Sequence, residues 1–190
     1  MTTVVLFHHA HGQTPGFLAF AQDLRTAGHT VHTPDLYEGS TFADLDEGVA
    51  HAGSVGFGEI IGRGTKAAQD LPPDVVYAGF SLGVLPAQSL AQTRPGAKGA
   101  LLYSGCVPPS EFGGPWPTGV PLQIHMKDAD PWGEEDRPAA EALVQEVEDA
   151  ELFIYPGSGH IFTEPGLADH DEQAAGLLME RTLAFLDRVV

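Results

Sequence analysis

Short apolar runs alternate with amphipathic segments along the whole chain. Most of these runs are continuously apolar and do not alternate with polar residues, which is typical of strands covered on both faces. The run at 30–33 is weaker and more polar than the others. The predicted strands are 4–7, 30–33, 75–78, 100–103, 122–126 and 152–155.

The segments between these runs carry apolar residues at helical spacing. Phe17, Phe20, Ala21 and Leu24 recur every three or four positions, and Gly28 then ends the pattern. Strand and helix patterns alternate with no run of hairpins, which indicates a mostly parallel sheet with helices on both faces. The predicted class is α/β, with an open sheet of about six strands. The predicted helices are 17–27, 59–69, 84–90, 137–148 and 172–189.

The segment 37–58 has no clear period. A short helix within 43–50 is one interpretation. Gly53, Gly56 and Gly58 are not preceded by a strand, and no lysine follows them at the spacing of a phosphate-binding loop. We therefore expect them to form a flexible connection.

Composition and charge narrow the choice of partners. The 190 residues suit one domain, 1–190, and 43% hydrophobic residues are typical of a soluble globular protein. Asp and Glu number 26 against 9 Lys and Arg, a net charge of −17, so nucleic acid and anionic membranes are not expected partners.

The cysteine content and the N-terminal residues indicate the cellular compartment in which the protein is expected. Cys106 is the single cysteine, which excludes an internal disulfide and a Cys-rich zinc site. No apolar run approaches the roughly 20 residues that span a bilayer. The first residues lack the basic and apolar regions of a signal peptide. We expect a cytoplasmic protein.

The clearest chemical signal is the pentapeptide Gly79-Phe80-Ser81-Leu82-Gly83. It lies between a predicted buried strand and a predicted helix, and G-x-S-x-G in this context is the nucleophile elbow of α/β-hydrolases. The turn lifts the serine hydroxyl clear of the sheet at a helix N-terminus, where developing negative charge is favoured. The alternative interpretation is a turn with a purely structural role.

A serine nucleophile needs a base, and the base needs an orienting carboxylate, in the chain order Ser, Asp or Glu, His. His160 follows the last predicted strand, whereas His125 lies within a strand and His170 starts a helix. Asp128 and Asp130 both follow the strand 122–126. The residues alone leave these two aspartates as alternatives, and either could instead cap a turn.

Loop residues suggest how a substrate would be held. The backbone N–H groups of Leu82 and of Ala10, in the loop after the first strand, are the expected oxyanion hole. His8, His9 and His11 lack an obvious fourth metal ligand, so we expect neither a metal nor a cofactor. The candidate substrate-binding residues are His9, His11, Tyr37 and Trp132.

With these motifs in place, the chain resembles the dienelactone hydrolase family of α/β-hydrolases nearly end to end. The segments that carry the resemblance are 4–12, 27–29, the Pro-Asp-Leu-Tyr at 34–37, the elbow, the Asp-Pro at 130–131 and 155–162. The resemblance implies the α/β-hydrolase fold, and it selects Asp130 as the triad aspartate beside Ser81 and His160.

The chain departs from the family pattern at three positions. Ser81 stands where enzymes that open dienelactone typically have cysteine, His9 where they have a glutamate, and Glu164 near the place of an arginine that holds the substrate carboxylate. Glu164 would repel a carboxylate-bearing substrate, so we do not expect dienelactone itself.

The expected activity is hydrolysis of a small-molecule carboxylic ester through an acyl-enzyme. Thioester hydrolysis or acyl transfer on the same triad is one alternative, and a ligand-binding protein without catalysis is another. The oligomeric state is not predicted.

Overall fold

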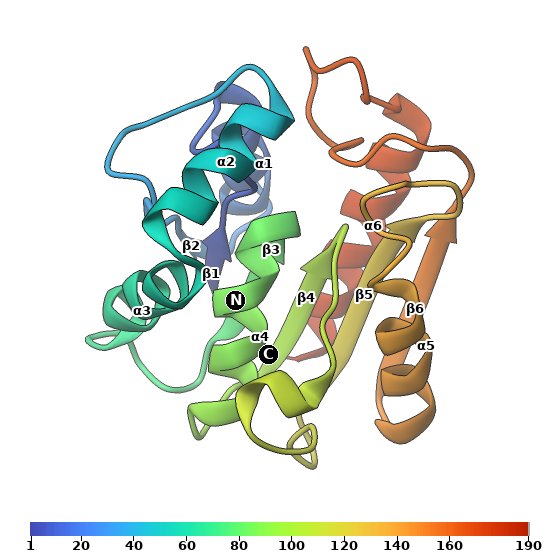
Figure 1. Ribbon diagram of the computed structural model, residues 1–190. Coiled ribbons are helices and arrows are strands. Elements are labelled where there is room, and N and C mark those ends of the chain that lie inside the picture. Colours follow the sequence, from blue (N-terminus) through green and yellow to red (C-terminus); the bar gives the residue numbers. More distant parts are fainter. Residues whose placement is uncertain (190) are drawn as a thin grey trace.

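One open sheet of six strands, all parallel, forms the centre of the computed structural model, which describes residues 1–189 (Figure 1). The strand order is β2-β1-β3-β4-β5-β6. This arrangement confirms the predicted α/β-hydrolase class and the predicted parallel sheet. The strands are β1 (Thr3–Phe7), β2 (Thr30–His32), β3 (Val76–Phe80), β4 (Gly99–Tyr103), β5 (Leu122–Lys127) and β6 (Ala150–Tyr155).

Helices cover both faces of the sheet (Figure 1). Side chains of β1 alternate between them: Val4 and Leu6 pack with α1 and α6, whereas Val5 and Phe7 pack in the core that includes α3, α4 and α5. The sheet is buried on both sides, which explains its continuously apolar strands. The helices are α1 (Pro15–Thr26), α2 (Leu45–Val55), α3 (Phe57–Ala68), α4 (Val84–Thr93), α5 (Arg137–Glu146) and α6 (Glu172–Arg188), with 3₁₀ turns η1 (Ser81–Gly83) and η2 (Pro109–Phe112).

Local caps fix where several helices begin. The hydroxyl of Thr14 accepts a hydrogen bond from Phe17 N, and Pro15 occupies the first turn of α1. Asp44 and Asp171 cap α2 and α6 in the same way through their carboxylates. Each cap satisfies a backbone donor that the first helical turn leaves unpaired.

The prediction was wrong for the segment around Gly53, Gly56 and Gly58. Gly53 lies inside α2 and Gly58 inside α3, and only Gly56, at φ 94°, separates the two helices. The fully buried positions of α2 are Gly48 and Ala52, and the half-buried Leu45, Val49 and Val55 pack beside them, so a glycine interrupts the apolar period of this face. A Cβ at Gly48 would lie 2.1 Å from Ala10 O, so the helix packs directly on the loop after β1.

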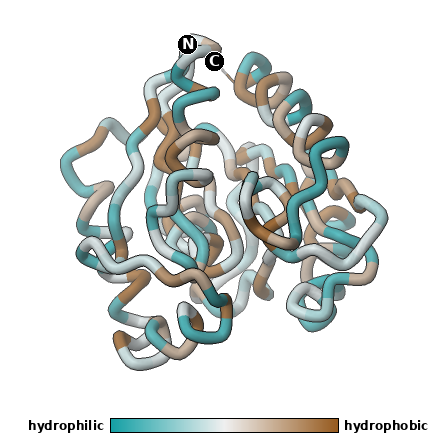
Figure 2. The backbone as a smooth tube through the Cα atoms, turned by 90° about the horizontal axis from the view of Figure 1, so that it is seen from above, coloured by the Kyte–Doolittle hydropathy of each residue, from teal (hydrophilic) through white to brown (hydrophobic). Residues whose placement is uncertain are grey.

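Viewed from above, apolar and polar residues alternate along the outer helices, and the two ends of the described chain lie side by side (Figure 2). Thr2 Oγ1 donates to Leu186 O at 2.9 Å. This hydrogen bond joins the residue before β1 to the last turn of α6. Within residues 1–189, no helix combines the length and apolar character needed to cross a membrane.

Candidate active site

Four loops meet at the carboxyl end of the sheet, where chain connections from β1 and β3 diverge to opposite sides. They follow β1, β3, β5 and β6, and they carry Ala10, Ser81, Asp130 and His160 respectively. Crevices at such switch points are the usual ligand sites of open α/β sheets.

The turn after β3 holds Ser81 in a strained conformation. Its φ is 48°, in the left-handed region that residues with a side chain rarely adopt. A Cβ at Gly79 would lie 2.1 Å from Gly83 O, and one at Gly83 would lie 2.4 Å from Phe7 O. Glycine is therefore required on both sides of the serine, because backbone approaches backbone at each position.

Two short hydrogen bonds join Ser81 to a carboxylate. Ser81 Oγ donates to His160 Nε2 at 2.7 Å, and His160 Nδ1 donates to Asp130 Oδ2 at 2.6 Å. His160 and Asp130 are each only 5% exposed. The carboxylate thus fixes the tautomer that leaves Nε2 able to accept a proton from the serine hydroxyl.

The other candidates for base and carboxylate lie elsewhere. Asp128 is exposed and accepts from Gly157 N, so it closes a turn between β5 and β6. His125 is fully buried between Tyr155 and Gln123, and burial lowers its pKa to about 3. The geometry brings Asp130, and not Asp128, to His160.

Two residues that the sequence did not single out hold the backbone of His160. Ser104, buried after β4 at φ 55°, donates from its hydroxyl to His160 O at 2.6 Å. Asp169 Oδ2 accepts from His160 N at 2.9 Å. Their signal in the sequence is weak, since a serine after a strand and an aspartate in a loop are common turn formers.

A cleft of about 250 Å³ opens beside the serine. Ala10 and Leu82, the expected oxyanion-hole residues, both line it, and so does Trp132. The N–H of Ala10 has no acceptor within residues 1–189, so it is free to meet a substrate oxygen. Other lining residues are Val49, Ala52, Phe57, Val84, Leu85, Val107 and Asp136.

Comparison with known proteins identifies the family of the chain. The dienelactone hydrolase family model matches residues 1–190. The chain belongs to the dienelactone hydrolase family. It is therefore a hydrolase of the ester-cleaving class. A comparison with curated protein sequences gave no match.

Solved structures of two dienelactone hydrolase-like proteins and of one esterase share the fold at low identity. A dienelactone hydrolase-like promiscuous phosphotriesterase from metagenomic libraries is 18% identical with a TM-score of 0.74, over 100% of this chain and 87% of that chain. A dienelactone hydrolase from Anabaena variabilis is 20% identical with a TM-score of 0.70, over 98% and 86%. Esterase PE8 is 19% identical with a TM-score of 0.68, over 100% and 93%.

His9 and Glu164, the two residues outside the elbow that depart from the dienelactone hydrolase pattern, contact each other. His9 Nε2 donates to Glu164 Oε2 at 2.7 Å, and the Thr14 hydroxyl donates to the same oxygen at 2.8 Å. Burial lowers the pKa of His9. Burial alone would raise the pKa of Glu164, but the hydrogen bond and charge of His9, with the Thr14 hydroxyl and the charge of His11, outweigh it and the pKa is lowered. The lowered pKa of His9 favours a neutral imidazole, and the lowered pKa of Glu164 favours an ionised carboxylate.

Three of the four candidate substrate-binding residues are buried outside the cleft lining. His9 contacts Glu164, His11 Nδ1 donates to Phe42 O, and the Tyr37 hydroxyl donates to Gly48 O at 3.0 Å. Burial also raises the pKa of Tyr37 to about 12. Of the four, only Trp132 lines the cleft.

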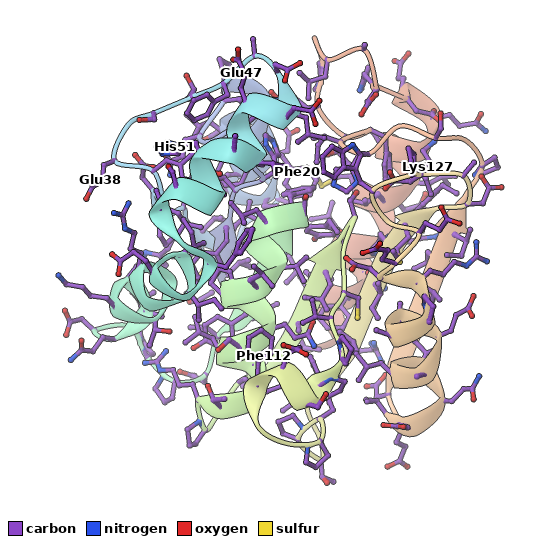
Figure 3. All side chains as sticks on the ribbon, in the orientation of Figure 1. Phe20, Glu38, Glu47, His51, Phe112 and Lys127 are labelled. Carbon is purple, nitrogen blue, oxygen red and sulfur yellow. The ribbon has the colours of Figure 1, made fainter. Side chains whose placement is uncertain are left out.

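The basic and thiol groups near the site already have partners or are shielded. Lys127, labelled in Figure 3, donates to Asp171 and to Pro156 O, so it is not free to hold a substrate carboxylate. Cys106 is fully buried, and burial raises the pKa of its thiol to about 12. Within the described part of the chain, no group of three or more His, Cys, Asp or Glu is placed to hold a metal ion.

Proposed function

We propose that this protein is a serine esterase that cleaves a small-molecule carboxylic ester through Ser81, His160 and Asp130. The observation that carries the proposal is the continuous pair of hydrogen bonds, 2.7 Å and 2.6 Å long, from the serine hydroxyl to a buried carboxylate. A serine hydroxyl is a weak nucleophile until an adjacent base accepts its proton. The cleft beside Ser81 supplies space for the ester.

The reaction proceeds in two halves. Ser81 Oγ attacks the ester carbonyl while His160 Nε2 takes the hydroxyl proton, and Asp130 stabilises the imidazolium. The tetrahedral oxyanion accepts hydrogen bonds from the N–H groups of Ala10 and Leu82. His160 then gives the proton to the leaving alcohol. In the second half His160 takes a proton from water, which attacks the acyl-serine carbonyl. His160 then returns the proton to Ser81 Oγ and the acid leaves.

The first test is covalent labelling. Intact-protein mass is measured after treatment with a fluorophosphonate, for the wild type and for Ser81→Ala, with circular dichroism to verify that both are folded. We expect a single adduct on the wild type and none on Ser81→Ala. On a panel of nitrophenyl esters, Ser81→Ala should lower kcat by roughly 10⁴–10⁶-fold. A folded wild type that takes no adduct would overturn the proposal.

A further inference from the structure

A single carboxylate faces the cleft that holds Ser81. Asp136, the residue before α5, lines the cleft, and no other charged side chain does so within residues 1–189. A Cβ built at Gly105 would lie 3.4 Å from Asp136 Oδ2 and 3.5 Å from Ser81 O. Asp136 Oδ2 and Ser81 O therefore both lie within van der Waals distance of the same point beside Gly105.

Helix capping does not account for this side chain. Asp136 occupies the cap position of α5, where a carboxylate ordinarily accepts from a backbone N–H of the first turn. Here it makes no capping bond, and Oδ2 instead accepts from Cys106 N at 3.1 Å. Oδ1 has no hydrogen-bond partner within residues 1–189. One carboxylate oxygen is thus left for a ligand.

The carboxylate is partly removed from water. Burial raises the pKa of Asp136, the Cys106 N–H and the charge of His160 offset that effect only in part, and the nearby carboxylates of Glu135 and Asp130 add to it. A positively charged group in the cleft would compensate the desolvated charge, whereas a negatively charged one would add to its cost.

Two exposed aromatic side chains border the same cleft. Phe57 is 49% exposed and Trp132 is 44% exposed, and both line the cleft. Trp132 N donates to Asp130 Oδ1 at 2.9 Å, so the triad carboxylate also fixes the backbone that carries this indole. Aromatic faces attract cations, and quaternary ammonium groups most characteristically. The net charge of −17 would further draw cations toward the protein.

We propose that the cleft selects esters that carry a permanent positive charge, such as a trimethylammonium group. Asp136 and the rings of Trp132 and Phe57 hold the cation while Ser81 attacks the ester carbonyl. This inference rests on the proposed esterase function. On this inference Asp136, and not Glu164, is the residue that repels carboxylate-bearing esters. The carboxylate of Glu164 faces His9 and Thr14 instead of the cleft.

The test compares esters of the same shape that differ only in charge. On the alcohol side the pair is butyrylcholine and 3,3-dimethylbutyl butyrate. On the acyl side it is the nitrophenyl esters of 4-(trimethylammonio)butyrate and of 5,5-dimethylhexanoate. We expect kcat/KM of the wild type to favour the cationic member of at least one pair by about tenfold or more, mainly through KM. Equal or lower kcat/KM for the cationic member of both pairs would overturn the inference.

Two matched variants separate the local carboxylate from the overall charge. Asp136→Asn removes the charge but keeps an acceptor oxygen for Cys106 N, and Glu135→Gln removes the same charge at the exposed neighbouring position. The cationic-to-neutral ratio should fall to about twofold or less in Asp136→Asn and stay within about twofold of the wild type in Glu135→Gln. An equal fall in both variants would assign the preference to the general field of the protein and overturn the site.

Failure of the proposed function gives a different result. An active esterase that hydrolyses the neutral esters and takes the fluorophosphonate, yet shows no charge preference, overturns only the cation site. A folded protein that hydrolyses no ester of either kind and takes no adduct removes the proposed function, and the cation site with it.

Discussion

Two buried histidine–carboxylate pairs lie on the same edge of the sheet, and they differ in what the second imidazole nitrogen meets. In the His160–Asp130 pair that nitrogen accepts from the Ser81 hydroxyl. In the His9–Glu164 pair, Nδ1 of His9 is the buried side-chain atom without a hydrogen-bond partner within residues 1–189. The bond lengths to the carboxylates, 2.6 Å and 2.7 Å, are nearly the same.

A histidine–carboxylate contact is therefore not in itself evidence of a catalytic role. In the proposed mechanism the first pair serves catalysis, because His160 can take the proton of the Ser81 hydroxyl while Asp130 stabilises the imidazolium. The second joins the loop after β1 to the loop after β6, since His9 and Glu164 are far apart in sequence. We therefore assign chemistry to the first pair and loop positioning to the second.

The largest expected difference is in turnover. Asp130→Asn should lower kcat by about 10⁴-fold because the imidazole loses the group that fixes its tautomer, as in other triads. Glu164→Gln, the same carboxylate-to-amide change in the other pair, should lower kcat by about tenfold at most, since it acts only through loop position. Steady-state kinetics on one nitrophenyl ester measures both. A loss above about 10³-fold in Glu164→Gln would show that the second pair takes part in the chemistry.

The second pair should matter more for stability. Glu164→Ala leaves the buried donors of His9 and Thr14 without an acceptor, so it should lower the free energy of unfolding by about 2–4 kcal/mol. Glu164→Gln keeps an acceptor oxygen and should cost about 1 kcal/mol. Urea denaturation of the two variants and the wild type measures the difference. Equal costs for alanine and glutamine would mean that the acceptor oxygen kept by glutamine contributes nothing to stability.

The protonation of His9 gives a pH test of the same pair. Folding lowers the pKa of His9 from its ordinary value of 6.5 because the imidazole is buried, so the unfolded chain binds a proton at higher pH than the folded chain does. Stability therefore falls as the pH drops from 7 to 5, with His9 contributing a slope of up to about 1.4 kcal/mol per pH unit.

His9→Gln should make that slope shallower. Burial also lowers the pKa of His8 to about 4 and that of His125 to about 3, so part of the slope remains in the variant. Urea denaturation at each pH measures the slope. An unchanged slope in His9→Gln would contradict the assignment of a neutral buried imidazole.

The smallest effect should come from the neighbouring aspartate. Asp128 is exposed and only accepts from Gly157 N, so Asp128→Asn should change kcat less than about threefold. The same ester assay measures it beside Asp130→Asn. A damaging Asp128→Asn together with a mild Asp130→Asn would reverse the assignment of the orienting carboxylate.

The sequence predicted the parts of the molecule that depend on strong local patterns. Continuous apolar runs located the strands, and the glycines around Ser81 located the elbow, because a Cβ at Gly79 would lie only 2.1 Å from Gly83 O. The helix 45–55 was predicted only in part, as a possible short helix within 43–50, and the glycines that follow were expected to form a flexible connection. The glycines within and beside this helix interrupt the apolar pattern by which a helix is recognised in sequence.

Other parts of the site depend on contacts between distant segments. Asp136 precedes a helix and resembles an ordinary cap in sequence, yet its carboxylate faces the cleft. His9 and Glu164 each lie near the expected site, but only the fold shows that they bond to each other and do not line the cleft. Long-range pairing of this kind leaves no periodic trace in one sequence.

The strained backbone at Ser81 sets selection for stability against selection for turnover. Within residues 1–189 the non-glycine residues with positive φ are Glu38, Ser81 and Ser104, and the last two belong to the site. Such conformations cost on the order of 1–3 kcal/mol each. A library sorted only for heat tolerance should therefore enrich glycine or asparagine in place of Ser81, and the survivors would be robust proteins that no longer turn over substrate.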